Sequence, residues 1–268
     1  FTSDLLGLMK KHGNKAPVLI TSSIQALQDN PYGRSKKAGE ELLLQYQEET
    51  GSKVYVYRLQ NVFGKWCRPN YNSAVATFCY NIANGLPIVV NDRERLMSLV
   101  YIDDVVSTFI DAMEGKEKPA KDGIHYVMTV TPIKLGEVAD LVQSFRETRS
   151  TLKIPDMSDP FVKKLYSTYL SYLPEEQFSY PLNMNVDQRG SFTEFIKTEN
   201  SGQVSVNISK PGVTKGNHWH HTKNEKFLVV SGEGTIRFRN VNEKKVIEYK
   251  VNGEKLEMVD IPPGYTHN

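Results

Sequence analysis

The chain has few cysteines, no long apolar run and no excess of charge. Its two cysteines, Cys67 and Cys79, have no metal-ligand spacing, so two reduced thiols are expected. No apolar stretch approaches the roughly 20 residues of a membrane-spanning helix, and nothing resembles a secretory signal. The net charge of +2 comes without a basic stripe, which argues against nucleic-acid binding. We therefore expect a cytoplasmic enzyme with neither a nucleic acid nor a membrane as its partner.

A glycine-rich phosphate-binding fingerprint is also absent. In dinucleotide-binding folds this fingerprint lets the backbone approach a pyrophosphate at the N-terminus of a helix. This chain instead opens in a predicted helix, TSDLLGLMKKHG at 2–13. Glycines that bind a dinucleotide therefore cannot be assigned from this sequence.

The pattern of the chain changes near residue 175, and 268 residues are enough for two domains. Before this point short strands alternate with helices, which are expected at 31–49, 73–84, 104–114, 136–149 and 158–173. The segment LPEEQFSYPL reads as a linker, and strand-like segments separated by Gly, Asn and Lys turns follow it. The sequence predicts an α/β domain at 1–173 and an all-β barrel or jelly roll at 174–268.

Hydroxyl groups follow an early apolar strand. Residues 18–20 form a short continuous apolar run, which is typical of a buried parallel strand, and residues 21–23 (TSS) come directly after it. Ligands of open α/β sheets bind at this carboxyl end of the strands. A helix should follow, because Asn30 can cap it, Pro31 suits its first turn and Gly51 follows its end.

Tyr32 and Lys36 lie one turn apart on the same face of this helix. A phenol is a poor proton donor and acceptor at neutral pH, but an ammonium one turn away stabilises the phenolate. A serine hydroxyl from Ser23, or alternatively Ser22, could hydrogen-bond a substrate carbonyl. Together these groups would protonate an alkoxide while a hydride arrives from a nicotinamide. The YxxxK pattern alone is common, whereas a strand ending in Ser-Ser followed by PYGRSK is more specific.

This segment resembles the extended short-chain dehydrogenase/reductases, a Rossmann-like family that acts on nucleotide sugars. The resemblance implies catalytic roles for Ser23, Tyr32 and Lys36, and it implies NADPH as the cofactor, bound in part by Tyr32 and Lys36. Ser22 would then be a substrate contact. The segment QNVFGKW at 60–66 looks like the N-V-Y-G segment of the family, which lies over the nicotinamide and sugar, and this implies that Asn61 contacts the cofactor or the substrate.

A second segment of this family is present with one departure. VYIDDV at 100–105 resembles its strand-to-helix element near the diphosphate, but the arginine usually found four residues before that tyrosine is Met97. Arg93 and Arg95 are close enough to replace it, or they are ordinary solvated charges. In relatives several strand–helix units precede the strand at 18–23, so we expect this chain to lack an N-terminal segment.

Four of the six histidines lie between residues 218 and 267. On a β-strand, His218 and His220 would leave the same face of the sheet. Glu225 follows after a short turn, and His267 comes later, near the end of the chain. Three imidazoles and a carboxylate converging inside a barrel predict a divalent transition metal. Zn²⁺ is the first choice, because nothing in the sequence demands redox chemistry, and other such metals stay possible.

The spacing resembles the cupin family, whose first motif matches at Gly212, His218, His220, Glu225 and Gly232. The second motif matches in part, at Pro262, Gly264 and His267. Leu256 stands where that motif has a glycine, and the chain ends at Asn268, so we expect a C-terminal piece to be missing as well. His221 should face away from the cluster.

Two further segments resemble cupin-type nucleotide-sugar 3- and 3,5-epimerases. DQRGSF at 187–192 looks like their D-x-R-G-x-F segment, which implies that Arg189 binds the substrate. QVSVNISKPGVTKGNHWH at 203–220 looks like the segment that runs into their catalytic histidine. His218 is therefore either a metal ligand or a catalytic base, and the sequence does not decide between these roles.

The order of the two halves is similar to bifunctional UDP-sugar epimerase/reductases of capsular polysaccharide synthesis. This resemblance implies that the cupin half epimerises C3 of a UDP-2-acetamido-2,6-dideoxy-4-hexulose and that the reductase half reduces C4 with NADPH. The implied product is UDP-N-acetyl-6-deoxy-L-talosamine, a precursor of UDP-N-acetyl-L-fucosamine. A homodimer is expected, because reductases of this type and cupins both commonly pair.

Two other functions for the cupin half stay open at this point. It could be a metal-dependent oxygenase or isomerase that acts on another small molecule. It could also be a metal-stabilised docking or dimerisation module beside an active reductase. If the metal is catalytic, it would polarise the keto oxygen of the substrate as a Lewis acid.

Overall fold

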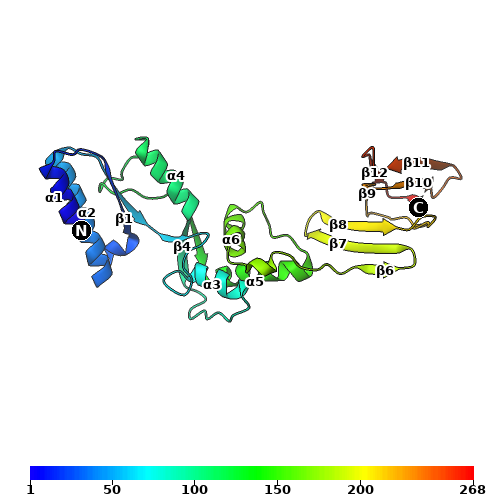
Figure 1. The fold of residues 1–268 in the computed structure, drawn as a ribbon, viewed down its shortest axis with the longest axis horizontal. Coiled ribbons are helices and arrows are strands. Elements are labelled where there is room, and N and C mark those ends of the chain that lie inside the picture. Colours follow the sequence, from blue (N-terminus) through cyan, green and yellow to red (C-terminus); the bar gives the residue numbers. More distant parts are fainter. The chain divides into compact units, whose positions relative to one another are not determined.

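The computed structural model describes all residues, 1–268, and divides them into two compact units. The first contains Phe1–Pro181 and Ile196–Gln203, and the second contains Leu182–Phe195 and Val204–Asn268. The division at Pro181 falls within the LPEEQFSYPL segment that the sequence marks as a linker. Figure 1 labels many of the helices and strands of both units. None of the helices combines the length and the apolar character that crossing a membrane requires.

A parallel β–α–β arrangement lies near the start of the first unit. Strand β1 (Val18–Ser23) pairs in parallel with β2 (Val54–Leu59), and helix α2 (Pro31–Thr50) connects them. The helix begins and ends where the sequence predicts. The Asn30 side chain accepts the Gly33 N–H at 2.8 Å, Pro31 occupies the first turn, and Gly51 ends the helix with φ 70°.

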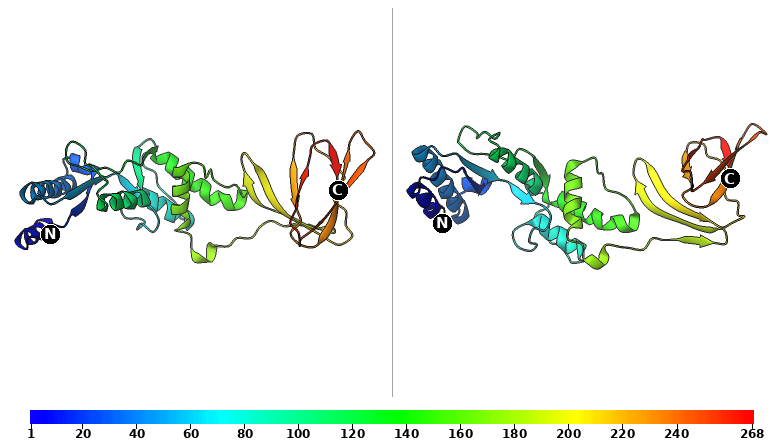
Figure 2. Two further views of the ribbon diagram at one scale, coloured as in Figure 1. Left: turned by 90° about the horizontal axis from the view of Figure 1, so that it is seen from above. Right: turned by 45° about the horizontal axis from the view of Figure 1, so that its top comes forward.

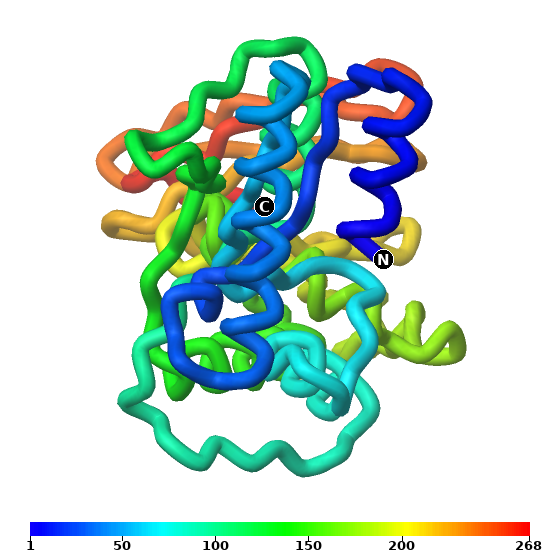
Figure 3. The backbone as a smooth tube through the Cα atoms, turned by 90° about the vertical axis from the view of Figure 1, so that its left-hand side faces the viewer, coloured from blue at the N-terminus to red at the C-terminus, as the bar shows by residue number.

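Helix α1 (Thr2–Lys11) lies beside α2, as the blue end of the tube in Figure 3 shows. Leu6, Leu43 and Tyr46 form part of the buried cluster between these helices and the first sheet. A short 3₁₀ helix, η1 (Ile24–Leu27), joins β1 to α2. A β-carbon on Gly33 would lie 2.3 Å from the Gln25 carbonyl oxygen, so only glycine lets the start of α2 pack this closely on η1.

A second sheet carries most of the core of the first unit. It has the order β3-β4-β5, with β3 parallel and β5 antiparallel to β4. Its strands are β3 (Asn61–Phe63), β4 (Leu96–Tyr101) and β5 (Val130–Lys134), and its helices are α3 (Ala74–Ala83), α4 (Ile102–Met113), α5 (Leu135–Thr151) and α6 (Pro160–Leu170). Apolar side chains from these elements, including Leu99, Val142 and Leu165, make one buried cluster. Helix α4 begins directly after β4, as predicted for VYIDDV.

The second unit is built from strands alone (Figure 2). Its sheets have the orders β6-β7-β8, β9-β12 and β11-β10-β13. The strands are β6 (Asn185–Asp187), β7 (Gly190–Thr198), β8 (Gly202–Ser209), β9 (Glu225–Leu228), β10 (Glu233–Asn240), β11 (Val246–Asn252), β12 (Met258–Ile261) and β13 (Tyr265–His267). The distal turn of β7 and β8 belongs to the first unit. The core of the second unit contains Ile236, Phe238, Val251, Val259 and Ile261.

The segment that carries His218 and His220 differs from the continuous strand that the sequence suggests. It makes one isolated bridge, in which the His267 N–H donates to the His218 carbonyl at 3.0 Å. Just before it, Gly216 and Asn217 have φ values of 102° and 62°. After these left-handed residues the segment bridges to β13 at His218, and the His220 carbonyl accepts the Gly264 N–H at 3.0 Å, without forming a regular strand.

Candidate active site and metal centre

Tyr32 and Lys36 lie on one face of α2, beside the carboxyl end of β1. The Lys36 ammonium donates to the Thr21 carbonyl at 3.1 Å and lies 5.6 Å from the centre of the Tyr32 ring. The tyrosine is 51% exposed. Because an ammonium has three N–H donors and this one uses a single donor on the strand, two remain for a ligand beside the accessible phenol.

The two serines at the end of β1 have different environments. The Ser22 side chain is buried, and its hydroxyl donates to the Glu40 carboxylate at 2.6 Å. The Ser23 oxygen accepts the Gln25 N–H at 3.2 Å as the cap of η1, and the residue is partly exposed. The hydroxyl hydrogen of Ser23 is therefore the one that can be donated to a ligand, which favours Ser23 over Ser22 for the catalytic role.

A buried ion pair that the sequence analysis did not identify lies behind these residues. Glu40 on α2 and Arg58 on β2 make two hydrogen bonds, at 2.7 and 2.8 Å. Burial by itself raises the pKa of the Glu40 carboxyl, but hydrogen bonds from Arg58 and Ser22 and nearby positive charge hold it below its usual value. Arginine inside the apolar strand VYVYRL is the sequence signal that could have indicated this pair.

Asn61 begins β3, and its side chain donates to the Ser98 carbonyl at 3.2 Å. The residue is exposed, and its side-chain oxygen can accept a further hydrogen bond. The structure thus ties Asn61 to strand β4 and leaves its acceptor for a ligand.

The structure distinguishes the two arginines near Met97. The Arg93 guanidinium donates to Asp140 at 2.6 Å, and its side chain packs over Gly136. Arg95 instead lines a pocket of about 240 Å³, together with Phe78, Val89, Asn91, Asp92 and residues of α3 and α5. Met97 packs against the apolar core. Arg95 is therefore the arginine placed to meet an anionic ligand.

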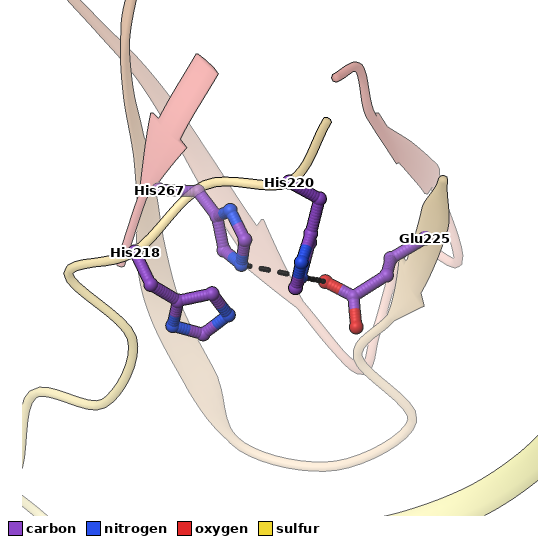
Figure 4. Close-up of side chains that lie close together, drawn as sticks. All are labelled: His218, His220, Glu225 and His267. Carbon is purple, nitrogen blue, oxygen red and sulfur yellow. Dashed lines mark ion pairs between the residues drawn. The ribbon is translucent and has the colours of Figure 1, made fainter. Parts of the chain in front are cut away.

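His218, His220, Glu225 and His267 come together in the second unit (Figure 4). Each offers one ligand atom, and these atoms all lie within 4.8 Å of one another. His267 is on β13 and Glu225 begins β9, while the two other histidines come from the segment that bridges to β13. The His218 ring centre is 4.9 Å from that of His220 and 4.6 Å from that of His267.

Polar atoms inside this cluster lack hydrogen-bond partners. The His220 Nε2 and Glu225 Oε2 atoms are 3.3 Å apart, yet both are buried without a hydrogen bond of good geometry. Burial, followed by the charge of His218, lowers the pKa of His267, which favours the neutral imidazole that binds a metal. Burial raises the pKa of Glu225, but Lys223 and the two nearby histidines more than offset this and keep it an anion. Three nitrogens and one carboxylate oxygen fit Zn²⁺ or a similar divalent metal.

His221 lies outside this cluster. It is exposed, and its ring lies 4.4 Å from that of Trp219. The His221 ring therefore lies against that of Trp219, two residues before it, and takes no part in the cluster.

Arg189 lies beside a pocket of about 570 Å³ in the second unit. Its guanidinium donates to Asp187 at 2.6 and 2.9 Å. Lys215, which the sequence analysis did not single out, lines the same pocket and donates to the Asn207 side chain at 2.7 Å. The pocket therefore presents two cations, one of them paired with a carboxylate.

Two known families match different parts of the chain. Residues 12–128 match the NAD dependent epimerase/dehydratase family, and residues 185–268 match the polysaccharide biosynthesis C-terminal domain. The expected order of a Rossmann-like α/β region followed by a β-rich region is thereby confirmed.

Individual proteins match over the whole chain. The chain is 47% identical over 270 residues to the UDP-2-acetamido-2,6-beta-L-arabino-hexul-4-ose reductase of Pseudomonas aeruginosa, and the match covers 100% of this chain and 71% of that protein. The crystal structure of the capsular polysaccharide assembling protein CapF from Staphylococcus aureus has 58% identity and a TM-score of 0.95, covering 100% of this chain and 74% of that one. CapF with the inhibitor 3-isopropenyl-tropolone has 55% identity and a TM-score of 0.91, with coverages of 98% and 73%. The chain therefore belongs to the CapF-like family of capsular polysaccharide enzymes, which includes UDP-keto-sugar reductases.

Proposed function

We propose that this chain reduces C4 of a UDP-2-acetamido-2,6-dideoxy-4-hexulose in its first unit, after its second unit has inverted C3. The proposal is carried by one observation, the coexistence of the Ser23–Tyr32–Lys36 group with the three-histidine, one-glutamate cluster in a chain of this family. The 4-keto group links the two sites. It acidifies the neighbouring C3–H for the first step, and the second step consumes it.

In the first unit, Tyr32 would donate its phenolic proton to O4 as the carbonyl carbon is reduced. Lys36 stabilises the resulting phenolate, and Ser23 donates a hydrogen bond to the same oxygen. NADPH, when bound, supplies the hydride, and Tyr32, Lys36 and Asn61 are the residues proposed to contact it. The preference for NADPH over NADH rests on the family resemblance alone.

In the second unit, we propose that His218, His220, Glu225 and His267 hold a divalent metal, with Zn²⁺ as the first choice. The metal, when bound, supplies Lewis-acid stabilisation of negative charge on the keto oxygen. His218 is the exposed member of the cluster, so it can reach a substrate either from a ligand position or as the base that removes the C3 proton. Arg189 and Lys215 would bind the nucleotide diphosphate.

Product analysis by NMR in D₂O with the full-length enzyme tests this function. We expect deuterium at C3 from solvent, unlabelled hydrogen at C4 from unlabelled NADPH, and the L-talo configuration. If C3 keeps its original hydrogen and configuration while C4 is reduced, the epimerase half of the proposal is wrong. If NADPH is not consumed, the reductase half is wrong.

Arg95 in the pocket of the first unit should bind the diphosphate of the UDP-sugar. Replacement of Arg95 by alanine is expected to raise the KM for the sugar by roughly tenfold to 10²-fold, because a charge-assisted hydrogen bond to an anion is lost. Initial rates of NADPH oxidation at varied sugar concentration measure this change.

Arg93→Ala is the matched control for Arg95→Ala. It removes a nearby surface charge that is paired with Asp140, and its KM should stay close to that of the wild type. Equal KM changes in the two variants would contradict the assignment of Arg95.

A structural role for the metal is the second candidate function of the cluster. It is favoured by the backbone bridge between His218 and His267, which a metal would clamp. If it is correct, metal removal should lower the thermal stability of the second unit while leaving the C3 stereochemistry of the product unchanged.

We also propose a homodimer, by resemblance, and light scattering on the purified enzyme measures its mass.

A further inference from the structure

Glu40 continues the row of functional side chains on α2. Tyr32, Lys36 and Glu40 are spaced by four residues and therefore share one helical face. Tyr32 lies at the exposed start of the helix, Lys36 is partly buried, and Glu40 is fully buried. The row thus leads from the accessible phenol into the interior of the first unit.

The Glu40 carboxylate connects α2 to both strands of the first sheet. Its Oε1 atom accepts the Ser22 hydroxyl of β1 at 2.6 Å and the Arg58 Nε–H of β2 at 2.8 Å. Its Oε2 atom accepts from the Nη2 of the same arginine at 2.7 Å. Glu40 and Arg58 are only 0% and 5% exposed, so water does not replace these bonds readily.

Ser22 lies between two residues that the proposed chemistry uses. The Thr21 carbonyl before it accepts the Lys36 ammonium, and Ser23 after it presents the hydroxyl proposed to meet the substrate carbonyl. Because adjacent residues of a strand move together, fixing the Ser22 side chain fixes both neighbours. The same carboxylate belongs to the helix that carries Tyr32, so it sets the position of the phenol relative to Ser23.

Arg58 anchors the other end of this network. Its Nη1 atom lies 3.3 Å from the Tyr126 hydroxyl and 3.4 Å from an oxygen of Asp122. Its backbone N–H donates to the His125 carbonyl at 3.1 Å. The guanidinium is therefore held from the segment next to β2 as well, so a rotation of α2 would strain its bonds to Glu40.

We propose that Glu40 is a positioning residue for hydride transfer, which acts through Ser22 and Arg58 to keep Tyr32, Lys36 and Ser23 in mutual register. The proposal rests on the reductase function proposed above. The proposed role requires a carboxylate at position 40 because of the hydrogen-bond donors that surround the Glu40 side chain. Ser22 and Arg58 direct three donors at two oxygens, and an amide offers only one acceptor oxygen. In either orientation of a glutamine, its NH₂ group would face an N–H of Arg58.

Replacement of Glu40 by glutamine tests this role in the full-length enzyme with NADPH and the 4-keto sugar. We expect kcat for reduction to fall by up to about 10²-fold, because small displacements of reacting groups have effects of this size, with the KM for the sugar changed by less than about threefold. Deuterated NADPH should show a larger kinetic isotope effect on kcat than in the wild type. A loss of folded enzyme alone would leave the isotope effect unchanged.

Two further variants make the test decisive. Glu41→Gln makes the same chemical change on an exposed position of the same helix and should match the wild type. Ser22→Ala removes one donor but keeps the ion pair, so it decides the outcome if Glu40→Gln does not fold. In Ser22→Ala we expect a smaller fall in kcat, again with a raised isotope effect.

The C3 exchange in D₂O provides an internal reference, because it takes place in the second unit. Exchange should be unchanged in each variant. Equal losses of exchange and reduction, or a wild-type isotope effect in both Glu40→Gln and Ser22→Ala, would overturn the positioning role. A wild-type enzyme that does not oxidise NADPH would instead refute the proposed reductase function, so the two failures are distinguishable.

Discussion

Replacement of Tyr32 by phenylalanine is expected to lower NADPH-dependent reduction of the 4-keto sugar by about 10²- to 10⁴-fold, the range that a positioned general acid contributes. The variant keeps the aromatic ring above which the Lys36 ammonium lies and removes only the phenolic hydroxyl. Deuterium incorporation at C3 should continue, because it depends on the second unit. Stopped-flow absorbance of NADPH measures the first effect, and NMR in D₂O measures the second.

Tyr249→Phe is the matched control for Tyr32→Phe. Tyr249 is 50% exposed, against 51% for Tyr32, and it lies on β11 of the second unit. This variant should reduce the sugar at the wild-type rate. A Tyr32→Phe enzyme with an intact rate of NADPH oxidation would show that another group donates the proton to O4.

Replacement of His267 by alanine should release the metal and lower the rate of C3 exchange by at least about 10²-fold. The loss of a group that only hydrogen-bonds to a metal ligand already lowers metal affinity or activity by up to about 10²-fold, and this variant loses a ligand itself. His267 is only 3% exposed, and alanine at this position supplies no ligand atom in place of the imidazole. Reduction of a substrate that already has the inverted C3 should persist. Metal content by mass spectrometry and exchange by NMR measure the two parts of this prediction.

His221→Ala is the control for His267→Ala, since the His221 ring lies against Trp219 outside the cluster. It should keep its metal and its exchange rate.

His218→Asn separates the two roles that His218 could have. Loss of both metal and exchange would identify a ligand, whereas loss of exchange with the metal retained would identify the base. Normal exchange in metal-free His267→Ala would contradict a catalytic metal.

The sequence by itself determined the features that depend on neighbours along the chain. Asn30, Pro31 and Gly51 set the limits of α2, because a cap, a fixed φ and a left-handed φ each act within one helical turn. The four-residue spacing placed Tyr32 and Lys36 on one face for the same reason. The order of an α/β region and an all-β region followed from the change in hydrophobic period.

Only the tertiary structure decided which of several similar side chains is available to a ligand. Ser22 and Ser23 are the same residue type at adjacent positions. The Ser22 hydroxyl, however, donates its hydrogen bond to Glu40, which lies 18 residues away in the chain. Arg93 and Arg95 differ because Asp140 pairs with the first alone. The segment with His218 is no continuous strand, since it forms a single isolated bridge to β13 after two left-handed residues. These outcomes depend on partners distant in the chain. A local sequence pattern carries no information about which distant group will lie beside a given side chain in the folded protein.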